Sequence, residues 1–518
     1  MKTLPVIVHT PSWQQFAAII GIYFATVIFY RLFLHPLARF PGPKLAAVTR
    51  YVEGYYDVVR GGQYTWKIAE MHKKYGPIIR ISPYELHVDD PAYFEKLFRQ
   101  DGRWNKYWWS YERFAAKHST VFCVEHDVHR RRRAPLNAFF SKANVARRQS
   151  IVREKTNKLC YRLSQCSGSG ETVNLSAAVG ALVRDVAMEF ILSRDFHNLD
   201  MDDFNGSIGA IFQGSGIMWR ICKHIPWFRP VINALPRVVT RHTGDESGRA
   251  FLTFRKQLTE ITSEIMTSIA TNSCDPDAPR TVIHDILASS TLPEQEKTFE
   301  RVYDEMGALT GAAFETTAHV MRIILYYLYT QPAILSRLRA ELATLTTEPR
   351  LNELEQLPYL TAVLMEGLRL GPGNATRMAR IAPDRDLFYE NWRIPAGTPV
   401  GMTTILMHMD PRVYPEPEQF QPDRWMDADV RKKADKTFAP FSRGTRNCGG
   451  MQLAWAELYL GIAALVQKFD FTFDGAGPKD VICASDRFII GTEDSSGIKA
   501  YVTERGMSIA TRNMSSDR

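Results

Sequence analysis

The sequence lacks several patterns that would assign it to a common class of cofactor or nucleic-acid binders. No CxxC pair occurs among its seven cysteines, which disfavours a zinc ribbon or a thioredoxin-type redox motif. It has no GxGxxG strand–helix fingerprint and no P-loop, so it is not expected to bind a nicotinamide or flavin itself. The formal charge is +8, but the basic residues form no long tracts, which disfavours nucleic acid. A surface facing an anionic membrane, an acidic partner protein or plain solvent fits this charge as well.

The cysteines are also few and irregularly spaced for a chain of 518 residues. Their odd number suits a reducing compartment with free thiols, which disfavours a disulfide for Cys448. At 45% hydrophobic and 23% charged residues the composition is that of a globular protein, so global disorder is excluded.

One long apolar run is present, from Trp13 to Tyr30, and it carries no charge. As a helix it would be ~27 Å long, close to the ~30 Å hydrocarbon core of a bilayer, and residues 32–34 can extend it. A cleavable signal peptide is the alternative, but the run is long for one and no A-x-A-like site follows it. More basic residues follow the run than precede it. The positive-inside rule therefore leaves the C-terminal body in the cytosol, held by a single span.

The chain is expected to divide into an anchor, a stiff connection and one large body. The expected parts are residues 1–35 as a membrane anchor, 36–50 as a Pro-rich hinge, and 51–518 as a catalytic domain with a frayed C-terminal tail. Most long stretches of the body have helical periodicity. Strand-like pieces occur at 77–82, 85–88 and 497–503. The predicted fold class is mainly α with small β-sheets, preceded by one transmembrane helix.

The stretch FSRGTRNCGG (441–450) places Cys448 in a glycine-rich loop directly before an apolar helical run. Backbone N–H groups at the start of that helix would point back at the sulfur and stabilise a thiolate. A nucleophilic cysteine needs a nearby base, and the local sequence supplies none. A buried structural cysteine needs neither the glycines nor Arg446. An iron ligand beside a haem uses both, because Arg446 can meet a haem propionate.

This stretch resembles the haem-binding loop of the cytochrome P450 superfamily, FxxGxRxCxG. The fixed positions match at Phe441, Gly444, Arg446, Cys448 and Gly450. The resemblance implies the P450 fold, a haem b held by these residues, and Cys448 as the axial thiolate ligand of its iron. It is closest in form to the microsomal-type monooxygenases of filamentous-fungal secondary metabolism.

Further motifs follow in the order of that family. AAFETT (312–317), within a long helical stretch at 297–330, is similar to the distal-helix motif that delivers protons to iron-bound oxygen. There Thr316 would hold a water and Glu315 would connect it to solvent. Ala313 stands where the family usually has glycine, which narrows the oxygen groove slightly.

Glu366 and Arg369 match the family's ExxR, and FQPDRW (420–425) supplies Arg424 to complete a Glu–Arg–Arg cluster. A solvated helix pair is the default for ExxR alone. As a buried cluster the three residues would be structural rather than catalytic.

The run HDVHRRRRAPLNAFFS (126–141) resembles the haem-proximal helix of the family. By resemblance His129, Arg133 and Arg380 would contact the propionates. Arg130–Arg132 would include solvent-facing residues that dock an acidic electron donor. The resemblance implies the NADPH-dependent FAD/FMN reductase of the endoplasmic reticulum as that donor, with cytochrome b5 as a second candidate.

The substrate pocket is expected between the segments 103–122 and 212–231, which occupy variable and mobile regions of the family. For each aromatic side chain there, core packing is the competing interpretation. The pocket candidates are Trp108, Trp109, Tyr111, Phe114, Leu309, Ala312, Thr376 and Phe488. They imply a hydrophobic substrate that enters from the membrane lipid. By analogy a terpenoid is expected first, and a polyketide or alkaloid next.

The predicted function is therefore oxygen insertion from O2 into a C–H bond, at the endoplasmic reticulum membrane with the body in the cytosol. A haem-thiolate isomerase or dehydratase that does not use O2 is one alternative, although it has less use for Glu315 and Thr316. A non-enzymatic haem sensor is another, disfavoured by the apolar pocket and the basic docking face.

Overall fold

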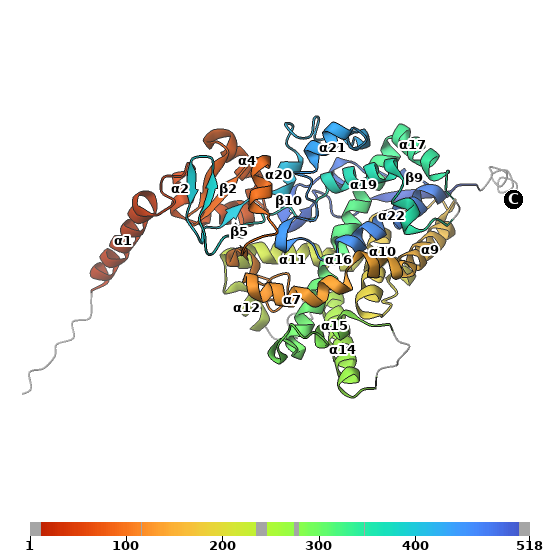
Figure 1. Cartoon of the computed structure of the whole chain (residues 1–518), viewed down its shortest axis with the longest axis horizontal. Coiled ribbons are helices and arrows are strands. Elements are labelled where there is room, and N and C mark those ends of the chain that lie inside the picture. The colour runs from red at the N-terminus through yellow and green to blue at the C-terminus, as the bar shows by residue number, and fades with distance from the viewer. Residues whose placement is uncertain (1–11, 115, 235–245, 274–278, 346–347, 507–518) are drawn as a thin grey trace, which may run out of the picture.

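The computed structural model describes residues 12–506 except for 115, 235–245, 274–278 and 346–347. Helices form most of the body, and a five-stranded sheet with several short helices lies at the N-terminal side (Figure 1). The prediction of a mainly helical chain with small sheets is confirmed. The predicted frayed tail lies almost entirely outside the described residues.

The longer helices of the body are α4 (Tyr64–Tyr75), α7 (His126–Phe139), α9 (Gln149–Cys166), α10 (Leu175–Leu192), α11 (Gly206–His224), α14 (Glu246–Ala270), α16 (Phe299–Thr330), α17 (Pro332–Leu342), α19 (Pro358–Leu370) and α22 (Met451–Lys468). Shorter helices connect them: α2 (Lys44–Val48), α3 (Tyr51–Gly54), α5 (Phe94–Leu97), α6 (Trp108–Tyr111), α8 (Lys142–Arg147), α12 (Phe228–Ala234), α15 (Val282–Leu287), α18 (Leu351–Leu354), α20 (Thr404–His408) and α21 (Ala428–Ala434). The long helix predicted at 297–330 is α16, which begins where the Thr298 side chain accepts a hydrogen bond from the Arg301 N–H.

The described strands are β1 (Ile78–Ser82), β2 (Glu85–Val88), β3 (Asn105–Lys106), β4 (Thr172–Asn174), β5 (Arg380–Ile381), β6 (Leu387–Tyr389), β7 (Trp392–Ile394), β8 (Val400–Gly401), β9 (Phe469–Phe473), β10 (Ser485–Arg487), β11 (Ile489–Gly491) and β12 (Lys499–Glu504). They form a five-stranded sheet in the order β1-β2-β8-β5-β3, a three-stranded sheet β4-β12-β9, and the pairs β6-β7 and β10-β11. The strands predicted at 77–82, 85–88 and 497–503 are confirmed.

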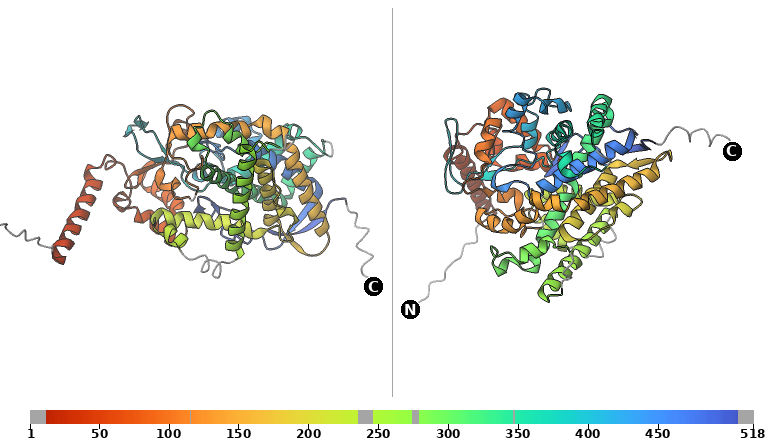
Figure 2. Two further views of the ribbon diagram at one scale, coloured as in Figure 1. Left: turned by 90° about the horizontal axis from the view of Figure 1, so that it is seen from below. Right: turned by 45° about the vertical axis from the view of Figure 1, so that its right-hand side comes forward.

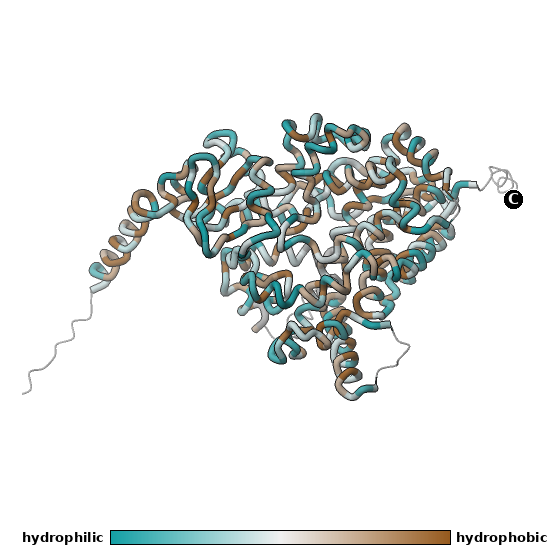
Figure 3. Tube along the Cα trace, viewed as in Figure 1, coloured by the Kyte–Doolittle hydropathy of each residue, from teal (hydrophilic) through white to brown (hydrophobic). Residues whose placement is uncertain are grey.

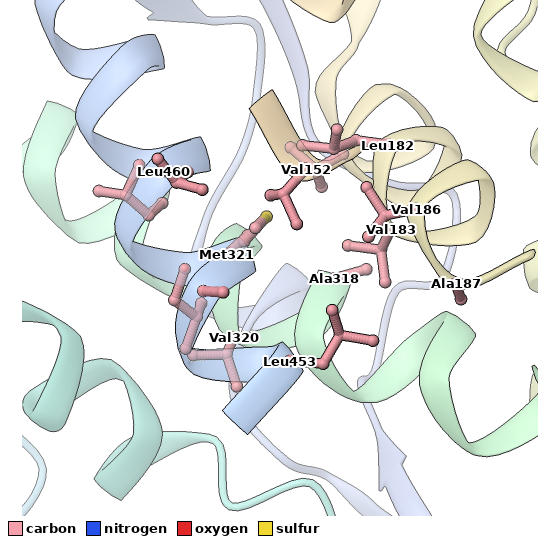
Figure 4. Packing of buried hydrophobic residues seen from close by; sticks show 14 of the residues in the cluster. Val152, Leu182, Val183, Val186, Ala187, Ala318, Val320, Met321, Leu453 and Leu460 are labelled. Carbon is pink, nitrogen blue, oxygen red and sulfur yellow. The ribbon is translucent and has the colours of Figure 1, made fainter. Parts of the chain in front are cut away.

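The main core forms where α9, α10, α16 and α22 pack together (Figure 4). Its labelled side chains are Val152, Leu182, Val183, Val186, Ala187, Ala318, Val320, Met321, Leu453 and Leu460. Glycines let two helices approach α16 closely: a Cβ at Gly461 would lie 3.0 Å from Met321 Cε, and one at Gly367 only 2.3 Å from Ile324 Cγ1. The core thereby fixes α22, which follows Cys448, against α16, which carries Glu315 and Thr316.

Helix α1 (Trp13–Phe29) stands clear of the body, as Figure 1 and the left view of Figure 2 show, and the π-helical turn after it (Tyr30–Leu34) joins it to the body. They are apolar along their length in Figure 3, with a mean hydropathy of 2.0 over Trp13–Leu34 and 0% of the segment buried. By length and composition this helix can cross a membrane. Among the described residues it is the one candidate span.

The Pro-rich segment after the helix is fastened to the body. Leu37 and Phe40 belong to a buried cluster with the five-stranded sheet. The buried Arg80 guanidinium donates to the Arg31 carbonyl (2.8 Å), and the Arg80 N–H donates to the Pro41 carbonyl (2.7 Å). Residues 36–50 are thus packed onto the body and include helix α2.

A buried network of charges joins the end of α11 to the N-terminal part of the body. Lys223 pairs with Glu53 (2.7 Å) and Asp57 (2.6 Å), and all three side chains are no more than 2% exposed. Arg377 pairs with Glu53 (2.8 Å) and with Glu85 (2.7 Å). Because both signs are present at short range, the network compensates its own charge inside the protein.

Replacing the central cation tests that compensation. Lys223→Met leaves Glu53 and Asp57 short of a partner, and breaking a buried pair costs about 3–5 kcal/mol. At about 2.1 cal/mol/K of unfolding entropy per residue, we expect the unfolding temperature to fall by about 3–5 °C. The matched control is Lys256→Met, which removes an exposed pair with Glu260 (3.7 Å) and should shift it by less than about 1 °C. Circular dichroism on the detergent-solubilised chain checks both, and equal shifts would contradict a role for burial.

Candidate active site

Cys448 lies in the loop between a 3-10 turn at Gly444–Arg446 and helix α22. Its own N–H donates to the Phe441 carbonyl (2.9 Å). Burial raises the pKa of the thiol, while the N–H groups of Gly450 and Met451 and the charge of Arg133 lower it by less. The predicted donors to the sulfur are therefore present, but burial outweighs them and the free thiol stays protonated. A bound metal cation would hold it as a thiolate, because a coordinating thiol is deprotonated outright.

The same side chain is accessible to solvent. The groups packed around the sulfur nevertheless desolvate it, which raises the pKa of the thiol. An enzyme nucleophile would be expected to have a lowered pKa and a neighbouring base. Cys448 has a raised pKa instead, which favours the metal-ligand interpretation.

The loop glycines have different reasons for being glycine. Gly444 has φ 75°, and a Cβ there would lie 2.5 Å from the Arg99 carbonyl oxygen. Its close approach is therefore to the protein backbone rather than to a cofactor. A Cβ at Gly449 would touch the Arg133 guanidinium (3.4 Å), and one at Gly450 would meet nothing within 4 Å. The open space beside Gly450, next to Cys448, is a place where a flat cofactor can lie.

Arg446 is buried beneath the loop and donates to three backbone carbonyls. Its guanidinium contacts Trp104 O (3.1 Å), Cys123 O (2.9 Å) and Val124 O (2.8 Å). Through these bonds Arg446 holds the segment that contains α6 against the cysteine loop. Burial, and then the charge of Arg380, lower the pKa of Arg446 to about 10.

The other residues predicted to contact the propionates, two arginines and a neutral histidine, lie near Arg446. Arg133 donates to Asn447 O (3.0 Å), next to the cysteine, and Arg380 reaches Ser442 Oγ (3.5 Å). His129 is 4% exposed, and burial followed by the charges of Arg446 and Lys106 lowers its pKa strongly. No described ion pair involves any of these cations.

Lys106 in β3 joins this group, and sequence reasoning missed it. It is 4% exposed, lies 4.2 Å from the Tyr111 ring centre, and has a pKa far below its ordinary value, chiefly through burial and then through Arg446 and Arg380. The available signal was a lysine set between the aromatic residues of RWNKYWW. A buried cationic cluster with no acid paired to it within the described chain fits the two propionates of a haem.

A second charged cluster stabilises the proximal side without reaching the cysteine. Glu366 binds Arg369 in a fork (2.8 and 2.9 Å) and accepts from Arg424 (3.0 Å) and from Trp425 Nε1 (2.9 Å). Glu366 and Arg369 are both 0% exposed. Arg369 also donates to Pro417 O (2.7 Å), so the cluster ties α19 to the segment that leads toward the cysteine loop.

Comparison with known proteins decides the family. The sequence model of cytochrome P450 matches residues 51–494. The chain is 35% identical to the cytochrome P450 monooxygenase MO6277 of Ascocoryne sarcoides, over 90% of this chain and 94% of that protein.

The chain belongs to the cytochrome P450 family.

Two further fungal relatives match over nearly their full length. The chain is 33% identical to the grayanic acid biosynthesis cluster cytochrome P450 monooxygenase of Cladonia grayi, over 95% of this chain and 97% of that protein. It is also 33% identical to the N-acetyltryptophan 6-hydroxylase of Emericella nidulans, over 98% and 100%. The predicted P450 fold and the predicted class of enzyme, a P450 monooxygenase of fungal secondary metabolism, are confirmed.

In this P450 the distal pair lies on α16, one residue apart. Thr316 Oγ1 donates to the Ala312 carbonyl (3.0 Å), as threonine does within a helix. Glu315 is 5% exposed and accepts from Arg322 Nη2 (3.3 Å). Ala312 is exposed although α16 runs through the core, so its side of the helix is accessible to solvent. Leu309 and Ala313 pack against the main core.

Aromatic side chains from three distant segments pack against one another in one group, the aromatic box. Phe114 stacks on Phe122 (4.1 Å between ring centres), and Phe488 meets Phe114 edge-on (4.7 Å). Trp219 from α11 lies 5.4 Å from Phe488, and Tyr111 lies 5.9 Å from it. Tyr111, Phe114 and Phe488 were predicted, whereas Phe122 and Trp219 were covered only by their segments.

Two predicted pocket residues belong elsewhere. Trp109 lies under the Arg50 guanidinium (3.8 Å to the ring centre), and Trp108 is 43% exposed beside the same guanidinium (5.7 Å). The structure places neither in the aromatic box, because the short helix α6 turns them toward the N-terminal part of the body. Thr376 is 2% exposed and lies next to Ala375, whose N–H donates to the Phe488 carbonyl (3.1 Å).

The conformation of Gly444 generates one prediction. Gly444→Ala adds a φ penalty of about 1–2 kcal/mol and a clash with the Arg99 carbonyl. We expect it to lower the unfolding temperature and the recovered haem together. Gly475→Ala is the matched control, since Gly475 has φ 70° but open space around it. If the two variants lose equal stability, the close approach to Arg99 contributes nothing.

Lys106 generates a second prediction, with opposite signs in two states. In the haem-free chain Lys106→Met removes a buried, unpaired charge, so we expect equal or higher thermal stability. In the haem-loaded chain it removes a propionate contact, so we expect haem to transfer faster to excess apomyoglobin. Lys96→Met, at an exposed position, should change neither quantity. Destabilisation of the haem-free chain by Lys106→Met would contradict the unpaired charge.

Proposed function

We propose that this chain is a haem-thiolate monooxygenase in which Cys448 is the axial ligand. The observation that carries the proposal is the desolvated yet solvent-accessible thiol of Cys448, which lies near cations that have no acidic partner among the described residues. When bound, haem b supplies the activation of O2 and the insertion of one oxygen atom into a C–H bond.

In this proposal the protein binds and orients. Arg133, His129, Arg380 and Lys106 would hold the propionates, and Arg446, which donates to backbone carbonyls, would add its positive charge beside them. Phe441, Gly444 and Gly450 shape the loop that presents the sulfur. The cluster of Glu366, Arg369 and Arg424 keeps the proximal side rigid.

The chain also moves protons. Thr316 Oγ1 would hold a water near the reacting oxygen, and Glu315, paired with Arg322, would exchange protons with solvent. The presence of this acid–alcohol pair favours oxygen activation over a haem-thiolate isomerase or dehydratase.

The substrate we propose is a lipophilic secondary metabolite, with a terpenoid first and a polyketide or alkaloid next. Support comes from the aromatic box of Phe114, Phe122, Trp219 and Phe488, which offers apolar ring faces to a ligand. Leu309, Ala312 and Thr376 would complete its wall on the side of α16. Because one relative hydroxylates N-acetyltryptophan, aromatic amino-acid derivatives belong in the substrate panel.

Electrons are proposed to come from an NADPH-dependent FAD/FMN reductase, with cytochrome b5 as a second donor. Arg130 and Arg131 on α7 are exposed and suit an acidic partner, whereas Arg132 is paired with Glu296 (2.7 Å).

The proposed topology follows the sequence: residues 1–35 as a single-pass anchor in the endoplasmic reticulum, 36–50 as its connection, and 51–518 as the catalytic domain in the cytosol.

The carbon monoxide difference spectrum tests the ligand. Reduced, CO-bound protein is expected to show the red-shifted Soret band of thiolate ligation, and Cys448→Ala is expected to lose it. Cys123→Ala, which removes another buried thiol near the site, should keep the band. Survival of the band in Cys448→Ala would show that another residue is the ligand.

Oxygen consumption tests the reaction. With reductase, NADPH and a panel of terpenoids, polyketides and tryptophan derivatives, we expect O2-dependent product that carries one oxygen atom from labelled O2. Product formed without O2 or NADPH would favour the isomerase or dehydratase.

A further inference from the structure

A small, mostly polar crevice is lined on one side by α16, with Thr316 in its wall. It has a volume of about 20 Å³, enough for about one water molecule. Its lining residues are mostly polar or charged: Ser176, Glu315, Thr316, His319, Arg322, Gly373, Asp480, Ile489, Ile490, Thr492, Asp494, Ser495 and Gly497. Ser495 in this lining is exposed, so the crevice opens to the surface, and Thr316 lies in the same lining.

Most polar groups in the lining already have partners. Glu315 pairs with Arg322 (3.3 Å), Asp494 pairs with Lys479 (3.0 Å), and Asp480 accepts from the Gly477 N–H (2.8 Å). Thr492 Oγ1 donates to Asp494 O (2.7 Å). Each of these polar groups is therefore already bonded to a neighbour within the protein.

His319 differs from them. Its side chain is 5% exposed, and among the described lining residues its Nε2 is a buried nitrogen with no hydrogen-bond partner. A buried polar atom left unpaired costs about 1–3 kcal/mol, so such an atom beside a water-sized space is best explained by a bound water. His319 follows Thr316 by three positions, which places both side chains on one face of α16.

His319 stays neutral at physiological pH. Burial, and then the charge of Arg322, lower its pKa to about 3. A neutral imidazole nitrogen can accept from a water or donate to it, depending on the tautomer, without storing a charge in the interior.

We propose that His319 is a positioning residue whose Nε2 holds a water in this crevice and so connects solvent at Ser495 with Thr316 Oγ1. This rests on the proposed monooxygenase function, since the protons are those consumed when O2 is reduced. Protons enter from solvent, pass along the held water and reach the hydroxyl of Thr316. Glu315 is committed to Arg322, and the crevice supplies a second route beside it.

The division of oxygen between two products reports proton supply without any substrate. One NADPH and one proton from solvent reduce O2 to hydrogen peroxide and leave NADP⁺. Two NADPH and two protons convert O2 into two waters. Slower proton delivery favours the first outcome, so the yield of peroxide per NADPH rises when the route is blocked.

The test uses the full-length chain with reductase in vesicles, and compares three variants with the parent. His319→Phe fills the site and removes the nitrogen, and we expect it to raise the peroxide yield per NADPH about threefold to tenfold. This is well below the 10²–10⁴ that a direct general acid contributes. His319→Gln, which places an amide at the reach of Nε2, is expected to stay near the parent value. His319→Leu is a second apolar variant in case Phe does not fit.

Infrared spectroscopy of the reduced carbon monoxide complex gives a readout that does not depend on turnover. Loss of an ordered water near Thr316 should displace the C–O stretching band in the apolar variants and leave it unmoved in His319→Gln. In D2O the band of the parent should shift more than that of His319→Phe.

The outcomes separate the two proposals. If the parent lacks the thiolate spectrum or consumes no O2, the proposed function fails and this inference fails with it. If the parent is active and the apolar variants keep both its spectrum and its peroxide yield, the role of His319 alone is overturned. An equal rise in Phe, Leu and Gln would indicate packing rather than hydrogen bonding and would also overturn it.

Discussion

Buried positive charge without a matching acid is the constraint on which the site depends. Arg133, Arg380, Arg446 and Lys106 lie close together around the cysteine loop, and no described ion pair involves them. Desolvated cations in such a group repel one another, so a bound anion lowers the energy of the whole arrangement. Arg446 donates its hydrogen bonds to backbone carbonyls of the segment that covers the loop. These bonds hold that segment against the cluster.

Two other buried charge clusters contain both cations and acids. Glu366 lies between Arg369 and Arg424, and Lys223 lies between Glu53 and Asp57. These balanced clusters join helices to one another and support the fold. In these two clusters cations and acids lie together, so no ligand is needed to pair them. The cluster around the cysteine loop lacks an acid, which indicates that an anionic group binds there.

Local features of the site could be predicted from the sequence, whereas features that depend on long-range contacts could not. The cysteine loop, the Glu–Arg–Arg set and the distal pair could be predicted, because each is a short pattern whose residue types follow from its chemistry. Lys106 could not, because its neighbours in the cluster, Arg380 and Arg446, lie far away along the chain. Trp108 was misplaced for the same reason: an aromatic side chain in an apolar stretch suits a pocket or a stack on Arg50 equally, and only the turn of α6 decides.

Phe488 connects β10 to β11 as a single residue, held at φ 70°. Glycine or asparagine would adopt this backbone conformation with less strain, so the bulky ring is kept against the preference of its own main chain. An exchange to a smaller residue would relax the turn and at the same time open one wall of the aromatic box. A substitution that relieves the backbone strain at this position would therefore also change how the substrate is held. We expect related enzymes that differ at this position to oxidise different substrates.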